Sequence, residues 1–156
     1  MKKLAAFPSL DNIERPDKQH LHELEEKYSK LLNWAKDQTF VTVYRVEGEW
    51  IPEYSRTPDQ TGWWYTTKWS QISSRYKHEI QGDHKIFALI IPESILEKET
   101  AWENALGEVR VPNEELREGR QEITDPTQAV EPTLENYMNQ FAFVREYKRL
   151  KTTPSA

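Results

Sequence analysis

The most apolar run in the chain, residues 85–92 (KIFALIIP), constrains the fold more than any other segment. A short and continuous apolar run is typical of a strand that is buried on both faces. We therefore expect a β-sheet in which this run is a central strand.

Three other segments predict further strands. Residues 38–46 (QTFVTVYRV) alternate and are rich in β-branched and aromatic residues, and shorter strands are expected over 63–67 (WWYTT) and 107–112 (GEVRVP). Between them we expect a long loop over 47–62, with two prolines and two glycines, of the kind that often forms a lid or a binding loop.

Helical spacing dominates the remaining segments. Residues 1–16 are expected to be a loose leader that ends at Pro16, followed by a helix over 18–36. A short helix is expected over 68–78 and a turn over 81–84 (QGDH). A last helix is expected over 133–150, with this buried stripe: Leu134, Tyr137, Met138, Phe141, Val144, and Tyr147 or Leu150. Both terminal helices are expected to pack on the sheet.

The length of 156 residues favours a single α+β domain. Its expected parts are the leader and N-terminal helix (1–37), a central core (38–118) and an irregular segment with the C-terminal helix (119–156). Residues 117–132 are polar and are expected to be irregular.

Composition excludes several classes of function. The chain has no cysteine, which rules out disulfides, thiolate catalysis and cysteine-ligated zinc. Its net charge of -5 disfavours general binding to nucleic acids. It has no apolar run of the roughly 20 residues that span a membrane, and the N-terminus does not read as a signal peptide. We expect a cytoplasmic protein.

The usual catalytic motifs are also missing from the sequence. The four histidines have no HExxH spacing, the five glycines form no phosphate-binding loop, and there is no serine nucleophile elbow. We therefore expect no metal site.

Three segments remain as candidates, and each has a structural alternative. Arg45 on the first strand either binds a diphosphate or pairs with a carboxylate. The hydroxyls of Thr66 and Thr67 either line a site or cap the next helix. Glu108 is either a catalytic carboxylate or an exposed residue that shares one strand face with Arg110.

In this order and spacing, the segments VYRV, GWWYTTKWSQISSRY and ALGEVRVP resemble the ADP-ribosyltransferase fold. The match is to the arginine–serine/threonine–glutamate class of bacterial and phage members and covers roughly residues 38–118. The resemblance implies a split, strongly bent β-sheet that holds NAD in a cleft, with no metal.

The resemblance also implies a role for each site residue. Glu108 would be the catalytic glutamate, Thr66 would hold it, and Arg45 would contact the NAD phosphates or ribose. Tyr76 and one of three aromatic residues would flank the nicotinamide; these three are Trp63, Trp64 and Tyr65. Two further NAD-binding candidates are Thr67, beside Thr66, and Val46, which stands where relatives often have glycine.

The implied activity is transfer of ADP-ribose from NAD to a macromolecule, most simply a protein. Such an enzyme would be a toxin, a phage-encoded modifier or an anti-defence protein, with a partner or antitoxin protein. Leu106 stands where members that modify arginine carry an acidic residue, so arginine is not the expected acceptor. Two alternatives are an NAD glycohydrolase and an inactive member of the fold that binds a protein partner.

Overall fold

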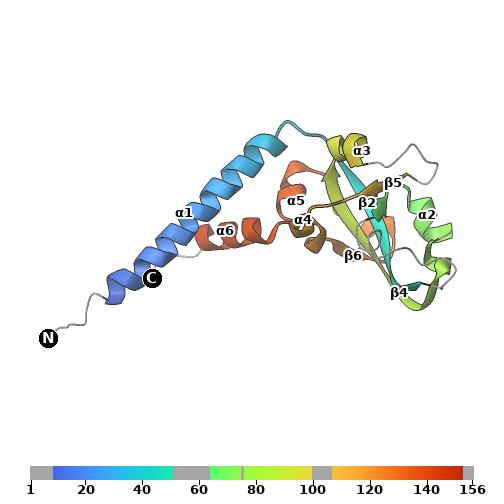
Figure 1. Cartoon of the computed structure of the whole chain (residues 1–156), viewed down its shortest axis with the longest axis horizontal. Helices are drawn as coiled ribbons and strands as arrows, with labels where there is room; N and C mark the ends of the chain where they lie inside the picture. Colours follow the sequence, from blue (N-terminus) through green and yellow to red (C-terminus); the bar gives the residue numbers. More distant parts are fainter. Residues whose placement is uncertain (1–8, 51–63, 75, 100–106, 153–156) are drawn as a thin grey trace.

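The computed structural model describes residues 9–50, 64–74, 76–99 and 107–152 of the chain (Figure 1). Within them the chain forms an α+β fold with an open five-stranded antiparallel sheet and six α-helices. The expected α+β class is therefore confirmed. No helix in these ranges is long and apolar enough to cross a membrane.

The sheet is built on one long antiparallel pair. Strand β2 (Phe40–Trp50) pairs with β4 (Ile80–Pro92), from Phe40 opposite Pro92 to Trp50 opposite Ile80. The central position expected for the apolar run is confirmed, because β4 lies between β2 and β6 (Gln121–Ile123) in the order β5-β3-β2-β4-β6.

Two expectations around this pair are wrong. Residues 47–50 continue β2 rather than opening a loop, and residues 81–84 belong to β4 rather than to a turn. The register shifts between Gly48 and Glu49, so Gly82, with a φ of 67°, lies in an irregular stretch of a continuing ladder. Pairing with the partner strand satisfies the backbone there, which the turn-forming residues alone did not suggest.

The short strands complete the sheet on both sides. Strand β3 (Trp64–Thr66) pairs with β2, and β5 (Glu108–Arg110) pairs with β3, so both expected strands are confirmed. Helix α2 (Trp69–Ser74) and a 3₁₀ turn (Tyr76–Glu79) follow β3, in place of one helix over 68–78.

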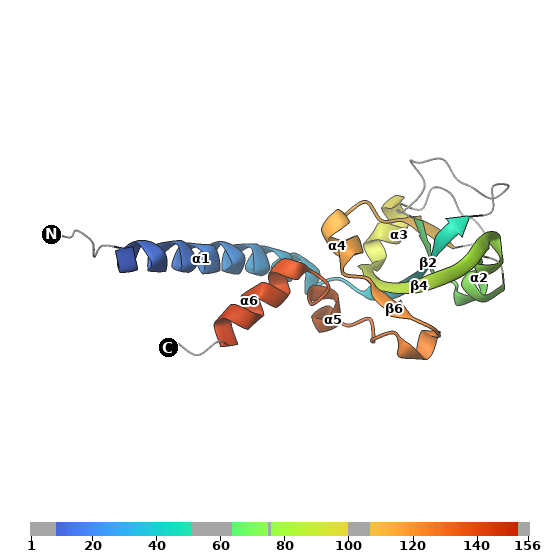
Figure 2. The same cartoon turned by 90° about the horizontal axis from the view of Figure 1, so that it is seen from below.

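Different helices pack on the two faces of the sheet. Figure 2 shows α3 (Glu93–Glu99) and α4 (Glu114–Glu118) on one side and α2 on the other. Side chains on the α2 side form a smaller apolar cluster that includes Val46 and Ile72. Those on the other side join the main core with α4, α5 (Leu134–Met138) and α6 (Ala142–Thr152).

The C-terminal part differs from its expectation in two ways. The segment expected to be irregular contains α4 and the edge strand β6. The single helix expected over 133–150 is instead two helices, α5 and α6, because Gln140 between them turns toward β4. There the Gln140 amide accepts a hydrogen bond from the Ile90 N–H at 2.7 Å and donates one to the Ile90 carbonyl at 2.9 Å, as a neighbouring strand would.

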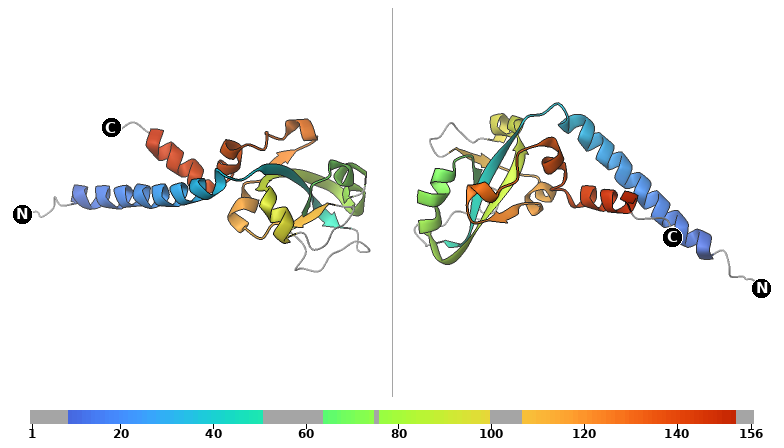
Figure 3. Two further views of the ribbon diagram at one scale, coloured as in Figure 1. Left: turned by 90° about the horizontal axis from the view of Figure 1, so that it is seen from above. Right: turned by 180° about the vertical axis from the view of Figure 1, so that it is seen from behind.

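The N-terminal helix is longer than expected and packs elsewhere. Helix α1 (Ser9–Ala35) begins before Pro16, whose missing N–H removes only one helical hydrogen bond. Figures 1 and 3 show α1 and α6 extending together away from the sheet, and the rings of Tyr28 and Tyr147 lie 4.9 Å apart between them. Only the C-terminal end of α1, such as Ala35, reaches the main core.

One buried phenol makes the core sensitive to alkaline pH. Tyr137 is 3% exposed and lies between the rings of Phe40 and Phe141. Burial raises its pKa from 10.0 to about 12. The unfolded chain loses this proton first, so the stability that the neutral phenol provides is complete below about pH 10 and is lost as the pH rises to about 12.

We therefore expect Tyr137→Phe to remove part of the alkaline loss of stability. At pH 12 the variant should retain about 2 kcal/mol more of its neutral-pH unfolding free energy than the native protein retains. Urea unfolding of both proteins between pH 8 and pH 12 measures this difference. Parallel loss of stability in the two proteins would contradict the buried ionisation.

Candidate functional site

A buried carboxylate lies at the start of β5. Glu108 is 9% exposed, and its Oε2 accepts a hydrogen bond of 2.8 Å from the hydroxyl of Tyr76. Thr66, 1% exposed, is the direct register partner of Glu108 on the neighbouring strand β3. Residues opposite each other in an antiparallel pair point to the same face, so Thr66, Tyr76 and Glu108 gather in one place, which we call the Glu108 site.

Backbone contacts hold the two strand ends of the Glu108 site together. The N–H of Thr67 donates to the carbonyl of Gly107 at 2.9 Å, and the Thr67 hydroxyl donates to the same oxygen at 3.3 Å. Gly107 has a φ of 63°, and a Cβ there would collide with the Thr67 hydroxyl. Glycine at 107 therefore allows the close approach that sets the position of Glu108.

The two threonines have different parts in this arrangement. Thr66 Oγ1 accepts a hydrogen bond of 3.0 Å from the N–H of Lys68, just before α2 begins. This contact fits the structural alternative, in which one threonine caps the turn into the helix. It also turns the chain into α2 and the 3₁₀ turn that carries Tyr76.

Aromatic side chains border the Glu108 site on the same face. Tyr44 is the register partner of Thr66, and its ring meets the ring of Trp69 edge-on at 5.2 Å. Burial raises the pKa of Tyr44, so this wall is neutral at physiological pH. Trp64, two residues before Thr66, points to the same face by strand alternation. Aromatic surface thus gathers beside a hydroxyl and a carboxylate.

The expected place of Arg45 in this site is wrong. Tyr44 shares a face with Thr66, so Arg45, its neighbour on β2, points to the opposite face of the sheet. There Arg45 Nη1 donates to the carbonyl of Trp64 at 3.0 Å, and Arg45 Nε lies 3.2 Å from Glu47 Oε2. This is the carboxylate pairing that was the structural alternative for Arg45.

Three other residues that were predicted to contact NAD do not line the Glu108 site in the described structure. Tyr65 is 2% exposed and also lies on the Arg45 face, so it does not border the Glu108 site. Val46 is on the Glu108 face but is 3% exposed and packs in the cluster with Ile72 and Tyr76. Trp63 lies outside the described residues.

Sequence reasoning gave no site role to three residues near Glu108. Tyr44 and Trp69 form the aromatic wall, and Arg110, which was already expected to share the face of Glu108, lies two residues further along β5. The alternation of residues 38–46 carried a signal for Tyr44, because Tyr44 and Arg45 cannot both face the same site.

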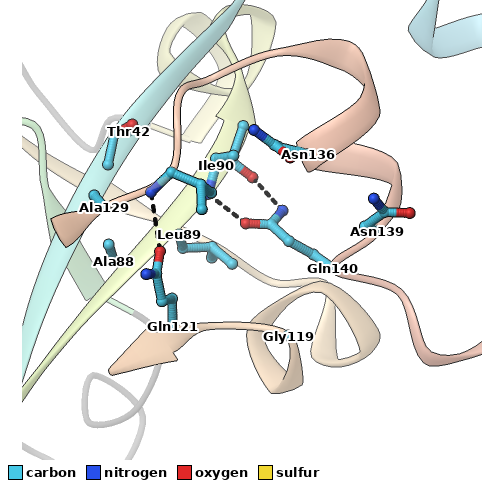
Figure 4. Close-up of a pocket in the computed structure, with 11 residues that line it drawn as sticks. Thr42, Ala88, Leu89, Ile90, Gly119, Gln121, Ala129, Asn136, Asn139 and Gln140 are labelled. Carbon is cyan, nitrogen blue, oxygen red and sulfur yellow. Dashed lines mark hydrogen bonds between the residues drawn. The ribbon is translucent and has the colours of Figure 1, made fainter. Parts of the chain in front are cut away.

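A cavity lies further along the same face (Figure 4). Its volume is about 200 Å³. Ala88 and Gln121 in its wall belong to the row of register partners that runs through Tyr44 and Thr66 to Glu108. The described residues that line it include no charged side chain, and its polar groups are mainly the amides of glutamine and asparagine. It offers no charge to a phosphate group.

Comparisons with known proteins add no assignment: no family model, no curated protein and no solved structure matches the chain. Within the part of the chain that the structure describes, no three metal-ligating side chains gather. The chemistry of the Glu108 site is therefore what indicates a function.

The Tyr76–Glu108 hydrogen bond should be measurable as a coupling energy. We expect Tyr76→Phe and Glu108→Met each to destabilise the fold, and the double variant to cost less than the sum by about 1–3 kcal/mol, because the bond joins a buried phenol to a carboxylate. Urea unfolding of the four proteins gives this coupling. The exposed change Lys27→Met provides the control, since its effect should add to that of Tyr76→Phe within about 0.5 kcal/mol. Simple additivity at Tyr76 and Glu108 would contradict the bond.

Proposed function

We propose that the protein is an NAD-dependent ADP-ribosyltransferase in which Glu108 is the catalytic carboxylate. One observation carries this proposal: the buried hydrogen bond from Tyr76 to Glu108, beside Thr66. The resemblance of the sequence to the ADP-ribosyltransferase fold assigns these three residues to one site, and they come from three separate segments of the chain. The proposal includes the finer fold assignment, with the five strands as a form of the bent ADP-ribosyltransferase core.

The chemistry that this site would support is glycosyl transfer. Breaking the bond between the ribose and the nicotinamide of NAD develops positive charge on the ribose, and nicotinamide leaves as a neutral molecule. A carboxylate held in place by Tyr76 would stabilise that charge. A nucleophilic group of the acceptor then bonds to the same ribose carbon and gives up its proton. The aromatic wall of Tyr44 and Trp69 would limit the access of water.

The fit to the diphosphate of NAD requires a change from the expected assignment. Arg45 lies on the other face, whereas Arg110 follows Glu108 by two residues on the same strand and the same face, about 7 Å further along. The proposal therefore assigns the diphosphate-binding charge to Arg110. Arginine suits this role because its planar guanidinium binds phosphate oxygens bidentately.

One observation favours the inactive alternative, a binding module that keeps the fold without turnover. The arginine that the resemblance assigns to NAD is instead paired with Glu47 on the opposite face. In that case the aromatic residues around Glu108 would contact a protein partner rather than nicotinamide. The third possibility, an NAD glycohydrolase, uses the same carboxylate with water as the acceptor.

The decisive variant is Glu108→Gln. Glutamine keeps the size and can still accept a hydrogen bond from Tyr76, but it cannot offset charge that develops only as the bond breaks. We expect NAD affinity to stay within a few-fold and the rate of nicotinamide release to fall on the order of a hundredfold or more. Calorimetry measures the affinity, and product analysis shows whether ADP-ribose ends free or on a macromolecule.

The matched control is Glu122→Gln, the same change at an exposed position on β6, whose register partner Phe87 lies on the Arg45 face. This control should release nicotinamide at the native rate. Equal rates in the native protein and Glu108→Gln would remove the catalytic role. A native protein that neither binds NAD nor releases nicotinamide would favour the binding module.

A further inference from the structure

The cavity of Figure 4 lies where β4 changes its pairing partner. The pairing with β6 stops at Gln121 opposite Ala88, and two residues further along β4 the backbone of Ile90 bonds to the side chain of Gln140 instead. Ala88 has only a methyl group, which leaves room beside the sheet. We call this space of about 200 Å³ the amide cavity, and the polar side chains of its wall are those of Thr42, Gln121, Asn136, Asn139 and Gln140.

Hydrogen bonds fix the orientation of both asparagine amides in this wall. Lys148 Nζ, which can only donate, lies 2.7 Å from Asn139 Oδ1, so the NH₂ group of Asn139 is left over. The NH₂ group of Asn136 donates to the carbonyl of Glu131 at 3.0 Å, which leaves the Asn136 Oδ1 oxygen. One asparagine therefore retains a donor and the other retains an acceptor.

Three polar atoms of the wall residues form no hydrogen bond with any described residue. They are Asn136 Oδ1, Asn139 Nδ2 and Thr42 Oγ1. The three residues are half-buried, and none of these atoms is among the described buried atoms that lack a partner, so all three are accessible. A bound molecule can therefore donate to Asn136 and accept from Asn139 without breaking any hydrogen bond of the fold.

The size and lining of the amide cavity define the class of molecule that fits it. An apolar cavity of about 150 Å³ holds benzene, so this one has room for a single ring with small substituents. The described lining residues carry no charge, which favours a neutral molecule. Ala88, Ala129 and Val130, which is 46% exposed, offer apolar surface to the faces of a ring.

We propose that the amide cavity binds a single neutral ring with a lactam edge, the chemistry of a pyrimidine base such as uracil. A lactam places an N–H beside a carbonyl, which matches one acceptor beside one donor. Asn136 and Asn139 are three residues apart at the end of α5, so their side chains are neighbours on the helix surface. Asparagine amides and threonine hydroxyls are also the groups that commonly bind base edges.

This inference does not depend on the proposed function. Ala88 and Glu108 belong to one row of register partners and are three strand spacings apart, or about 14 Å. A single ring in the amide cavity therefore does not reach Glu108. Such a ligand would contact both the sheet and α5, and it would stabilise the native state by mass action.

The test is a titration of uracil into the full chain, followed in proton–nitrogen NMR spectra. We expect saturable shifts of the side-chain amide signals of Asn136 and Asn139. Thr42→Val keeps the shape but removes the hydroxyl, and it should weaken binding about three- to tenfold. Asn139→Asp keeps the oxygen that bonds to Lys148 but replaces the donor with an acceptor, and it should weaken binding about tenfold or more.

Analogues of uracil test the lactam and the absence of charge. Pyrimidine lacks the lactam, and orotate adds a carboxylate to the uracil ring; both should bind about tenfold more weakly than uracil or worse. Uridine carries the same base on a ribose. Binding of uridine as tight as that of uracil would support a nucleoside as the source of the ring, and binding of uracil alone would support the free base.

Matched controls separate the amide cavity from general effects of charge and packing. Asn33→Asp on α1 and Thr152→Val on α6 make the same changes at exposed positions on the helices that extend away from the sheet (Figures 1 and 3). Both variants should bind uracil like the native protein, and so should Glu108→Gln. Thermal unfolding of each variant without ligand verifies folding.

Three results would overturn the proposal. The first is the absence of saturable shifts with uracil and uridine, as expected for a cavity that holds only water. The second is equal binding by the controls, Thr42→Val and Asn139→Asp, or equal binding of uracil, pyrimidine and orotate. The third is loss of uracil binding in Glu108→Gln, which would place the ring at Glu108. A native protein that releases no nicotinamide would leave all of these results unaffected.

Discussion

The long antiparallel pairing of β2 with β4 is the constraint on which the rest of the structure depends. It fixes the register from Phe40 opposite Pro92 to Trp50 opposite Ile80, and the shorter strands extend it on either side. Strand side chains alternate between faces, so this one register decides which side of the sheet each polar residue occupies. A slip of one residue would exchange Tyr44 and Arg45 between the two faces.

That alternation separates two kinds of chemistry. On one face the Glu108 carboxylate accepts a hydrogen bond from the Tyr76 hydroxyl, lies opposite Thr66 in the strand register and is bordered by aromatic rings. On the other face the guanidinium groups of Arg45 and Arg120 share the carboxylate of Glu47. The sheet between them separates Glu108 from Arg45. The two faces therefore differ in the charge that they present.

Sequence patterns predicted the elements whose own residues carry enough signal. The apolar run predicted β4, and the alternation of residue types predicted β2 and β5. The alternation in β5 also placed Glu108 and Val109 on opposite faces of the strand. The patterns failed where an element is stabilised by contacts with a segment that is distant in the sequence. Strand β6 is short and polar, and it exists because β4 offers it an edge. The break between α5 and α6 occurs because Gln140 bonds to the backbone of Ile90, fifty residues away.

The candidate site also has features that the sequence predicted and features that only the structure decided. The sequence by itself determined the α+β class and the order of the main elements, because these follow from local periodicity and residue type. The link between Thr66 and Glu108 was an implication of the family resemblance, and the pairing of their strands is seen only in the structure. Only the tertiary structure decided that Tyr76 reaches Glu108 and that Arg45 turns away from it. Those outcomes depend on strand register and on the approach of distant segments, and no spacing within one segment determines either.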